Sequence, residues 1–283
     1  MRYLGVSRAE TYSPNRVGGD AAVFRAVASE LERHGNEVLC VTEQELVSNG
    51  IPAGTDCIFQ MARSCEALAV LDKAGLPVVN TVQAVRNCGR SAQTRLLAGS
   101  GTIPVSMICP TSGVPAGWNR YPCWIKRPDS HAVERDDVRY ISDEEECAAA
   151  MRRFAVRGIK ECVLQSHVRG WIVKFYGVRG AGLVDCYAAG SKDGKFGLES
   201  HNERPDSACV DMDALASVAA RASDILGVDV YGGDAVVSTD GSITLIDFNE
   251  ERTSAASTAC TSSTRWKSSA LKSRRTATPP WTR

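Results

Sequence analysis

Short apolar runs alternate with amphipathic segments over the first 83 residues. The runs have the length of single strands and are MRYLGVS (1–7), NEVLCVT (36–42), CIFQMA (57–62) and LPVVNT (76–81). Two of the intervening segments place apolar residues at helical spacing, DAAVFRAVASELERHG (20–35) and SCEALAVLDKAG (64–75). We expect Asp20 to be the N-cap of the first helix and Gly35 to end it. Strands that alternate with helices predict a small parallel α/β domain over residues 1–83.

The pattern changes near Ala84, after which strands and helices no longer alternate one to one. Residues 84–170 predict an α+β unit with helices at 84–101 and 142–158 and strands at 104–110, 121–129 and 161–170. Residues 171–250 predict a mainly antiparallel sheet with one helix at 211–227. The last segment, 251–283, has almost no apolar periodicity, and we expect it to be a disordered tail or a stretch read in a shifted frame.

The closing strands of the third unit contain acidic residues where a buried strand would carry apolar ones. In GVDVYGGDAVVSTDGSITLIDFNE (227–250), Asp240-Gly241 is a strong signal for a two-residue hairpin turn. That turn places Asp234 opposite Asp247, and Asn249 points to the same face because side chains alternate along a strand. Opposed side chains have Cβ atoms about 5 Å apart, so the two carboxylates repel each other.

A divalent cation relieves this repulsion. Two carboxylates and one amide oxygen are hard oxygen ligands of the kind that Mg²⁺ prefers. The alternative is a hairpin whose acids are simply solvated. The sequence therefore predicts a magnesium site at Asp234, Asp247 and Asn249, with solvation as the competing interpretation.

Composition and charge narrow the class of protein. No apolar run approaches the roughly 20 residues of a membrane span, and no secretory signal opens the chain, so we expect a cytoplasmic protein. The 11 cysteines show no metal-binding spacing and are expected to be reduced thiols. Residues 1–251 hold 26 Lys and Arg against 33 Asp and Glu, and the basic tail lacks clustered cations, which argues against a nucleic-acid partner.

The segment ILGVDVYGGDAVVSTDGSITLIDFNE resembles the closing signature of the ATP-grasp superfamily, which includes glutathione synthetase and D-alanine–D-alanine ligase. The resemblance covers residues 1–250 and implies a pre-ATP-grasp α/β domain (1–83), then a first ATP-grasp lobe (84–170) and a second lobe with the metal-binding strands (171–250). In this superfamily the three positions matched by Asp234, Asp247 and Asn249 hold magnesium ions on ATP phosphates. The second position is usually Glu, and here it is Asp247.

The same resemblance implies further ATP-binding residues. Lys126 in PCWIKRPD matches the first phosphate lysine. Lys174 in WIVKFYGV matches the basic residue of a strand that points into the site. Both are the expected catalytic cations. Arg90 matches a basic residue early in the central helix. The hinge that faces adenine through its backbone matches Gln165, Ser166, His167 and Val168. The sequence departs from the family after Lys126, because RPDSHAVERDDV has no glycine-rich phosphate loop.

The function implied is an ATP- and Mg²⁺-dependent ligase that activates a carboxylate as an acyl phosphate for attack by an amine. Its substrates are expected to be small molecules or peptides. Two alternatives remain: a small-molecule kinase of the same superfamily, and a nucleotide-binding module without turnover. The sequence leaves the oligomeric state open, with a homodimer as one alternative.

Overall fold

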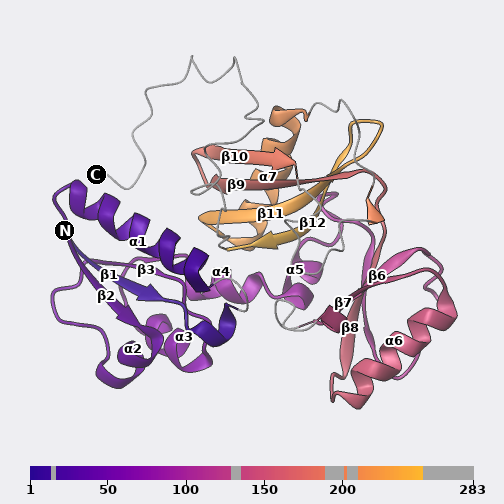
Figure 1. The fold of residues 1–283 in the computed structure, drawn as a ribbon, viewed down its shortest axis with the longest axis horizontal. Coiled ribbons are helices and arrows are strands. Elements are labelled where there is room, and N and C mark those ends of the chain that lie inside the picture. Colours follow the sequence, from indigo (N-terminus) through magenta and orange to yellow (C-terminus); the bar gives the residue numbers. More distant parts are fainter. Residues whose placement is uncertain (14–16, 129–134, 189–200, 203–209, 251–283) are drawn as a thin grey trace.

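The computed structural model describes residues 1–13, 17–128, 135–188, 201–202 and 210–250 (Figure 1). Three four-stranded sheets follow one another along the chain, and each has helices of its own. The tail 251–283, expected to be disordered or frame-shifted, lies outside the described residues. None of the helices in the described ranges is both long and apolar enough to cross a membrane.

The N-terminal sheet is parallel, with strand order β2-β1-β3-β4. Its elements in chain order are β1 (Arg2–Ser7), the 3-10 turn η1 (Glu10–Tyr12), α1 (Val17–Arg33), β2 (Glu37–Thr42), α2 (Glu43–Asn49), β3 (Cys57–Gln60), α3 (Cys65–Asp72) and β4 (Val78–Val79). Leu4, Val6 and Ile58 are fully buried beneath α2 and α3 and form the centre of this core. The predicted parallel α/β architecture is therefore confirmed.

Two details of this domain differ from the sequence-based prediction. Helix α2 was not expected; its signal was the pair Thr42 and Glu45, which form a capping box. Asp20 is not an N-cap, because α1 begins at Val17 and Asp20 lies within its first turn. The Asp20 carboxylate is buried and accepts hydrogen bonds from Ser13 Oγ at 2.5 Å and Arg8 Nη1 at 3.3 Å. These contacts compensate for the burial of its charge.

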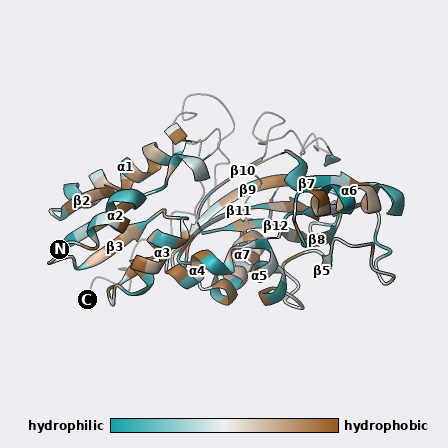
Figure 2. Cartoon of the chain, turned by 90° about the horizontal axis from the view of Figure 1, so that it is seen from below, coloured by the Kyte–Doolittle hydropathy of each residue, from teal (hydrophilic) through white to brown (hydrophobic). Residues whose placement is uncertain are grey.

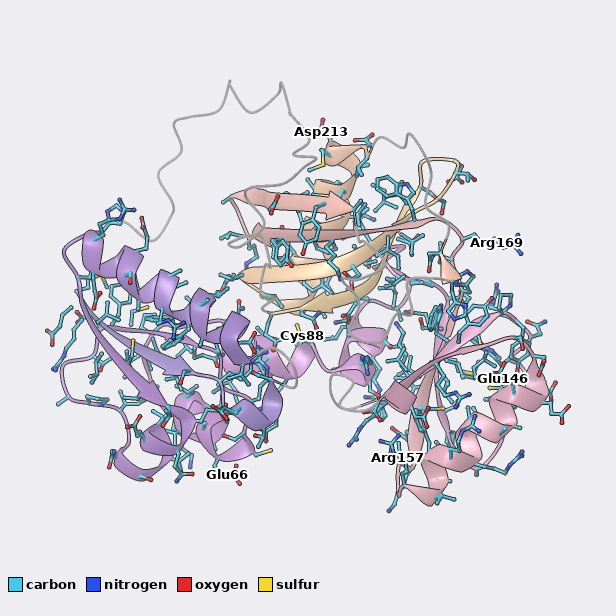
Figure 3. The ribbon with its side chains drawn as sticks, viewed as in Figure 1. Glu66, Cys88, Glu146, Arg157, Arg169 and Asp213 are labelled. Atoms are coloured by element: carbon cyan, nitrogen blue, oxygen red, sulfur yellow. The ribbon has the colours of Figure 1, made fainter. Side chains whose placement is uncertain are left out.

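Two short helices, α4 (Val82–Asn87) and α5 (Arg90–Leu96), connect the N-terminal domain to the rest of the chain (Figure 1). The sequence predicted one helix over 84–101, but it breaks at Cys88 and Gly89, where Gly89 is the N-cap of α5. Cys88 lies where α4 meets the second-lobe sheet (Figure 3), and its side chain joins the core of that sheet. The break thus turns the chain from one domain onto the next.

The first-lobe sheet is antiparallel, with strand order β5-β8-β6-β7. It is formed by β5 (Ser106–Pro110), β6 (Cys123–Lys126), β7 (Val138–Ile141) and β8 (Glu161–Ser166), with a 3-10 turn η2 (Arg135–Asp137) before β7. Helix α6 (Glu144–Val156) is capped by Asp143 and is amphipathic, with both hydrophobic and hydrophilic residues (Figure 2). Its apolar side covers one face of the sheet, where Phe154 and Met151 are buried against Ile125.

The second-lobe sheet is also antiparallel, with strand order β10-β9-β11-β12. Its strands are β9 (Trp171–Val178), β10 (Gly182–Ala188), β11 (Val230–Val237) and β12 (Ile243–Asn249). Helix α7 (Met212–Leu226) is capped by Asp211 and ends at Gly227 in the left-handed conformation. Phe175, Tyr231 and Phe248 pack beneath α7 in one core, so the alternate residues of their strands point to the opposite face.

Candidate functional site

The two acids of the closing hairpin are direct partners across β11 and β12, as predicted: Asp234 opposes Asp247. The predicted two-residue turn is wrong. Ser238 N–H donates to Ser242 O at 2.9 Å, and Gly241 N–H donates to Ser238 O at 2.9 Å, so the loop has three residues, with Gly241 at φ 83°. The extra loop residue shifts the register next to the turn, where Ala235 opposes Leu245.

A β-bulge restores the pairing of the acids. Ala235 opposes Leu245 while Asp234 opposes Asp247, so Ile246 is an additional residue on β12. The two one-residue offsets cancel. Without the bulge, Asp247 would oppose Gly233 and point toward the α7 core, where an uncompensated carboxylate is costly.

The third predicted ligand lies beside the acids. Asn249 is two residues beyond Asp247 on β12, and its Nδ2 donates to Asp247 Oδ2 at 3.0 Å. The side chains of all three residues point away from α7, whose core holds Phe248 and Ala235 from the same strands. The structure therefore brings Asp234, Asp247 and Asn249 together on one face of the sheet.

These oxygens fit a hard divalent cation. Asn249 is 3% exposed, and among the described residues its Oδ1 has no hydrogen-bond partner, an arrangement that is costly unless a ligand supplies one. The nearby carboxylates are the anionic oxygens that Mg²⁺ requires. No three His, Cys, Asp or Glu side chains cluster as a metal site within the described ranges. The set of ligands that the described residues offer is thus two carboxylates and one amide oxygen.

Lys174 lies on the neighbouring strand, directly opposite Asp234 across β9 and β11. Its ammonium group is 3.0 Å from Asp234 Oδ1, and the residue is 7% exposed. Asp234 is therefore between a cation on one neighbouring strand and a carboxylate on the other. This ion pair provides a positive charge in the same place where the sequence predicts phosphate and metal.

Lys126 reaches the same region from the first lobe. It ends β6 on the face opposite α6, since its neighbour Ile125 is buried in the α6 core. Lys126 Nζ donates to Gln165 Oε1 at 2.7 Å and, across the two lobes, to the carbonyl of Ile246 at 2.9 Å. Ile246 is the bulge residue, so the bulge supplies the acceptor that holds the lysine beside the acids.

Burial lowers the pKa of Lys126 to about 8; Arg90 also lowers it, while Asp247 and Asp234 oppose the shift. Arg90 begins α5, and its Nη1 donates to the carbonyl of Arg127 at 3.3 Å. The two basic residues are therefore close enough to interact electrostatically. Lys126 and Lys174 thus bring two cations to the two carboxylates, and Arg90 lies near Lys126.

The predicted hinge joins β8 to β9. Gln165 is buried and binds Lys126 through its side chain. Ser166 N–H donates to Val105 O at 2.9 Å, and His167 N–H donates to Pro122 O at 3.1 Å. The carbonyl of Val168 accepts from Asn202 Nδ2 at 3.1 Å. Several backbone groups of the hinge are thus used within the protein, which limits those that remain to contact adenine.

An aromatic group that the sequence analysis missed lies next to this hinge. Trp124 opposes Gln165 across β6 and β8, and its Nε1 donates to His167 Nδ1 at 3.1 Å. Tyr140 stacks on His201 with ring centroids 4.1 Å apart and an interplanar angle of 9°. Burial lowers the pKa of His167, and nearby His201 and Arg169 lower it further. The signal in the sequence was Trp124 two residues before Lys126, which places both on one face.

A second feature that the sequence did not predict connects the N-terminal domain to the end of β12. Glu250, 2% exposed, directly follows Asn249 and forms an ion pair with Arg63 from the loop after β3. Asn80, after β4, donates from Nδ2 to the carbonyls of Glu250 and Val230. Its Oδ1 accepts from Asp229 N–H at 2.7 Å and Val230 N–H at 2.9 Å. One asparagine therefore binds the start of β11 and the end of β12.

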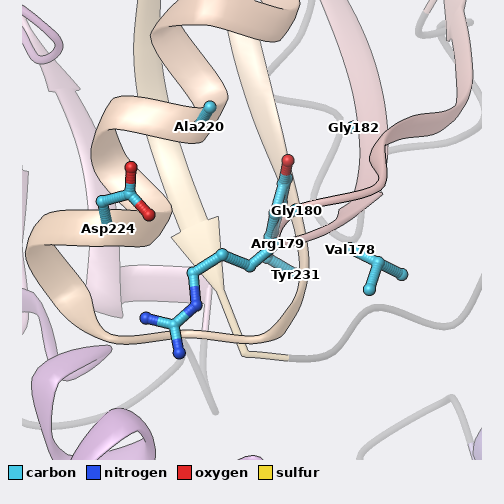
Figure 4. A pocket seen from close by; sticks show the side chains of 7 residues that line it. All are labelled: Val178, Arg179, Gly180, Gly182, Ala220, Asp224 and Tyr231. Carbon is cyan, nitrogen blue, oxygen red and sulfur yellow. The ribbon is translucent and has the colours of Figure 1, made fainter. Parts of the chain in front are cut away.

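A cavity of about 570 Å³ lies elsewhere, between α7 and the β9–β10 turn (Figure 4). Arg179, Asp224 and Tyr231 line it. Tyr231 belongs to the α7 face of β11, opposite the face that carries Asp234. This cavity is therefore separate from the acids and lysines.

No model of a protein family matches the sequence, and no curated protein matches it. Solved structures do share its fold. D-alanine–D-alanine ligase from Bacillus anthracis, complexed with ATP, has a TM-score of 0.65 at 12% identity, over 88% of this chain and 86% of the ligase. The ATP-grasp RimK domain protein from Sphaerobacter thermophilus has a TM-score of 0.60 at 19% identity, over 88% and 90%.

The D-Ala:D-Ser ligase VanG from Enterococcus faecalis is similar to the same extent, with a TM-score of 0.62 at 12% identity, over 88% of this chain and 90% of the ligase. Nearly the whole length of each protein takes part in these superpositions. Identities this low establish the architecture alone. The chain has the ATP-grasp fold.

Proposed function

We propose that the protein is an ATP- and Mg²⁺-dependent ligase that activates a carboxylate as an acyl phosphate and joins it to an amine. The observation that carries this proposal is the meeting of two lobes around opposite charges. Lys126 of the first lobe bonds to the bulge beside Asp247, while Lys174 of the second lobe pairs with Asp234. Such a set of cations and oxygen ligands fits a nucleotide triphosphate with its metal.

In this proposal Asp234, Asp247 and Asn249 hold Mg²⁺. A magnesium ion held by these residues would supply positive charge to the phosphoryl group during its transfer. Lys126, Lys174 and Arg90 bind the phosphate oxygens and keep the γ-phosphoryl group in line with the substrate carboxylate. Because transfer depends on positioning and electrostatics, the protein needs no nucleophile of its own.

The substrates proposed are small, with an amino acid as the first class to test. Two of the structural neighbours carry names that describe ligation of D-alanine to D-alanine or D-serine. The N-terminal sheet supports a substrate site near the metal, because Arg63 follows its strand β3 and reaches Glu250 beside Asn249. Ligands of parallel sheets bind outside the carboxyl ends of the strands.

The experiment is an isotope-transfer assay with the full-length chain, ATP, Mg²⁺ and a panel of amino acids. The carboxylate of each candidate is labelled with ¹⁸O, and inorganic phosphate is analysed by mass spectrometry. A ligase transfers label from the carboxylate to phosphate as the acyl phosphate is consumed. A kinase releases ADP and forms a phosphorylated product, without labelled inorganic phosphate. A binding module forms neither ADP nor labelled phosphate.

Asp247→Asn replaces one proposed carboxylate ligand with a neutral amide, which binds Mg²⁺ more weakly, and should abolish the label transfer. Asp240→Asn is the matched control, since Asp240 is an exposed acid in the turn of the same hairpin. ATP with Mg²⁺ should also raise the melting temperature of wild type and of Asp240→Asn. The rise should be much smaller for Asp247→Asn. Equal ATP-dependent stabilisation of both variants would contradict the proposed metal site.

A further inference from the structure

Four cysteines share the core of the first lobe: Cys109 on β5, Cys123 on β6, Cys147 on α6 and Cys162 on β8. None is more than 3% exposed. They lie on the α6 face of the sheet, whereas Lys126 and Gln165 occupy the other face. The chemistry of these thiols is therefore not explained by the proposed nucleotide site.

Two of them are positioned for a covalent bond. Cys109 and Cys162 oppose each other directly in the antiparallel pair β5–β8, with their sulfur atoms 3.6 Å apart. Directly opposed residues have Cα atoms about 4.5 or 5.5 Å apart. Both separations fall within the roughly 4.4–6.8 Å found for disulfides. A disulfide between them therefore requires rotation of the two side chains but no rearrangement of the backbone.

Other roles for the four thiols are less consistent with the geometry. No three His, Cys, Asp or Glu side chains in the described part of the chain are arranged to hold a metal ion, which argues against a zinc site. Buried cysteines also serve as small apolar side chains, but packing alone does not require two of them to face each other across a strand pair. The direct opposition distinguishes this pair from a general thiol-rich core.

We propose that Cys109 and Cys162 form a reversible disulfide when the protein meets a peroxide. The thiolate of one cysteine of the pair attacks one peroxide oxygen, the O–O bond breaks, and a sulfenic acid and water form. The sulfur of the other cysteine then attacks the sulfenic sulfur and releases a second water. Two thiols are oxidised and one peroxide is reduced, with a mass loss of about 2 Da from the protein for the two hydrogens removed.

The contact between the two sulfur atoms favours ionisation of one of them. The hydrogen bond with Cys162 lowers the pKa of Cys109 against the opposing effect of burial. The same hydrogen bond raises the pKa of Cys162, and burial raises it further. A thiolate on one side of the pair, with a thiol on the other, is the arrangement that sulfenic acid formation and its resolution require.

The bond is reversible by thiol–disulfide exchange, in which a thiolate attacks one of its sulfur atoms. The cross-link would tie β5 to β8 three residues before Gln165, the partner of Lys126. Oxidation would thus rigidify the lobe that carries the hinge.

The test treats the full-length protein with hydrogen peroxide under native conditions, removes the peroxide, and blocks remaining thiols with N-ethylmaleimide in denaturant. Peptide mapping should find a Cys109–Cys162 cross-link that dithiothreitol abolishes. With dimedone present during oxidation, Cys162→Ala should accumulate trapped sulfenic acid at Cys109, because the resolving thiol is missing. Cys123→Ala, which changes another thiol of the same core, should keep the cross-link.

Exposed Cys40 and Cys65 report whether the oxidant acted. If these two are oxidised while Cys109 and Cys162 are recovered with N-ethylmaleimide, the proposal is wrong. Recovery of Cys109 linked to Cys123 or Cys147 would also overturn it. Wild-type mapping decides the outcome even if a variant fails to fold, and none of these results depends on the ligase proposal.

Discussion

Lys174 Nζ lies 3.0 Å from Asp234 Oδ1, so a lysine neutralises one of the two opposed acids of the closing hairpin. The same carboxylate is a proposed ligand of Mg²⁺. The Lys174 ammonium group and a divalent ion therefore compete for the same carboxylate oxygen, Asp234 Oδ1. Nucleotide phosphates offer Lys174 another partner, and we therefore expect nucleotide to make the metal site available.

Lys174→Met should strengthen the binding of Mg²⁺ alone while it weakens the binding of ATP. Removal of the Lys174 cation reduces the competition for Asp234, and we expect a gain of roughly tenfold in Mg²⁺ affinity, which corresponds to about 1.4 kcal/mol. Loss of a phosphate-binding cation should weaken ATP by a similar factor. Thermal-shift titrations with MgCl₂, in the absence and presence of ATP, measure both effects.

Lys160→Met is the control for Lys174→Met, because Lys160 is an exposed lysine on the first lobe. It should leave both titrations unchanged. If Lys174→Met binds Mg²⁺ alone no better than wild type does, the lysine does not compete with the metal.

ATP binding should weaken as the pH rises through about 8, the pKa to which burial lowers Lys126 in the free protein. Above this pH the free amine is neutral, whereas bound phosphate favours the protonated form. Binding above this pKa must then take up a proton, and affinity should fall by at most about tenfold per pH unit. Calorimetry in buffers of different ionisation enthalpy measures this uptake.

Lys126→Met should bind ATP more weakly at neutral pH and lose the proton uptake. Lys174→Met serves as a comparison, since it also removes a proposed phosphate cation but keeps Lys126. Proton uptake that persists in Lys126→Met would assign the titration to another group.

Asn80→Ala should destabilise the protein by about 2–4 kcal/mol, because it removes several buried hydrogen bonds and leaves backbone groups of β11 without partners. Its side chain contacts Asp229, Val230 and Glu250. Urea denaturation followed by fluorescence measures the free energy of unfolding.

Asn87→Ala is the matched control for Asn80→Ala. Asn87 Nδ2 donates to Leu226 O at 2.9 Å, and its Oδ1 accepts an exposed bond from Gln83 Nε2 at 2.8 Å. Because the hydrogen bond from Gln83 is exposed to water, Asn87→Ala should lower the free energy of unfolding by only about 1 kcal/mol. Equal costs for the two variants would show that Asn80 does not clamp the two domains.

Gly241→Ala should cost about 1 kcal/mol, because Gly241 has φ 83° in the hairpin loop and a side chain disfavours that conformation. Thr239→Ala, in the same exposed loop, should be nearly neutral. Both variants should keep Mg²⁺-dependent ATP binding if the bulge at Ile246 holds the register of the acids. Loss of binding in Gly241→Ala alone would show that the loop, rather than the bulge, sets the pairing.

The arrangement of elements was largely predictable from the sequence. Alternation of strand and helix over residues 1–83 predicted the parallel sheet, since each crossover in such a sheet needs a helix. Helices α6 and α7 were predicted from their periodicity and are capped by Asp143 and Asp211, as the acidic residues at their starts indicate. Helix α2 was missed, although Thr42 and Glu45 provided a capping signal.

For the candidate site, the sequence determined which groups occur and on which strand each lies. Period-two alternation places Asp247 and Asn249 on one face of β12, and the resemblance selected Lys126, Lys174 and Arg90. The pairing of Asp234 with Asp247 was predicted from a two-residue turn, whereas the loop has three residues. It holds because the bulge at Ile246 compensates for the third loop residue.

Only the tertiary structure decided how these groups meet. Lys126 bonds to a carbonyl 120 residues later in the chain, and Asn80 reaches strands 149 to 170 residues away. Local propensity carries no information about such distant contacts, because they depend on how three separate sheets pack. The sequence by itself thus determined the chemistry available along each strand, while packing determined which charges share one space.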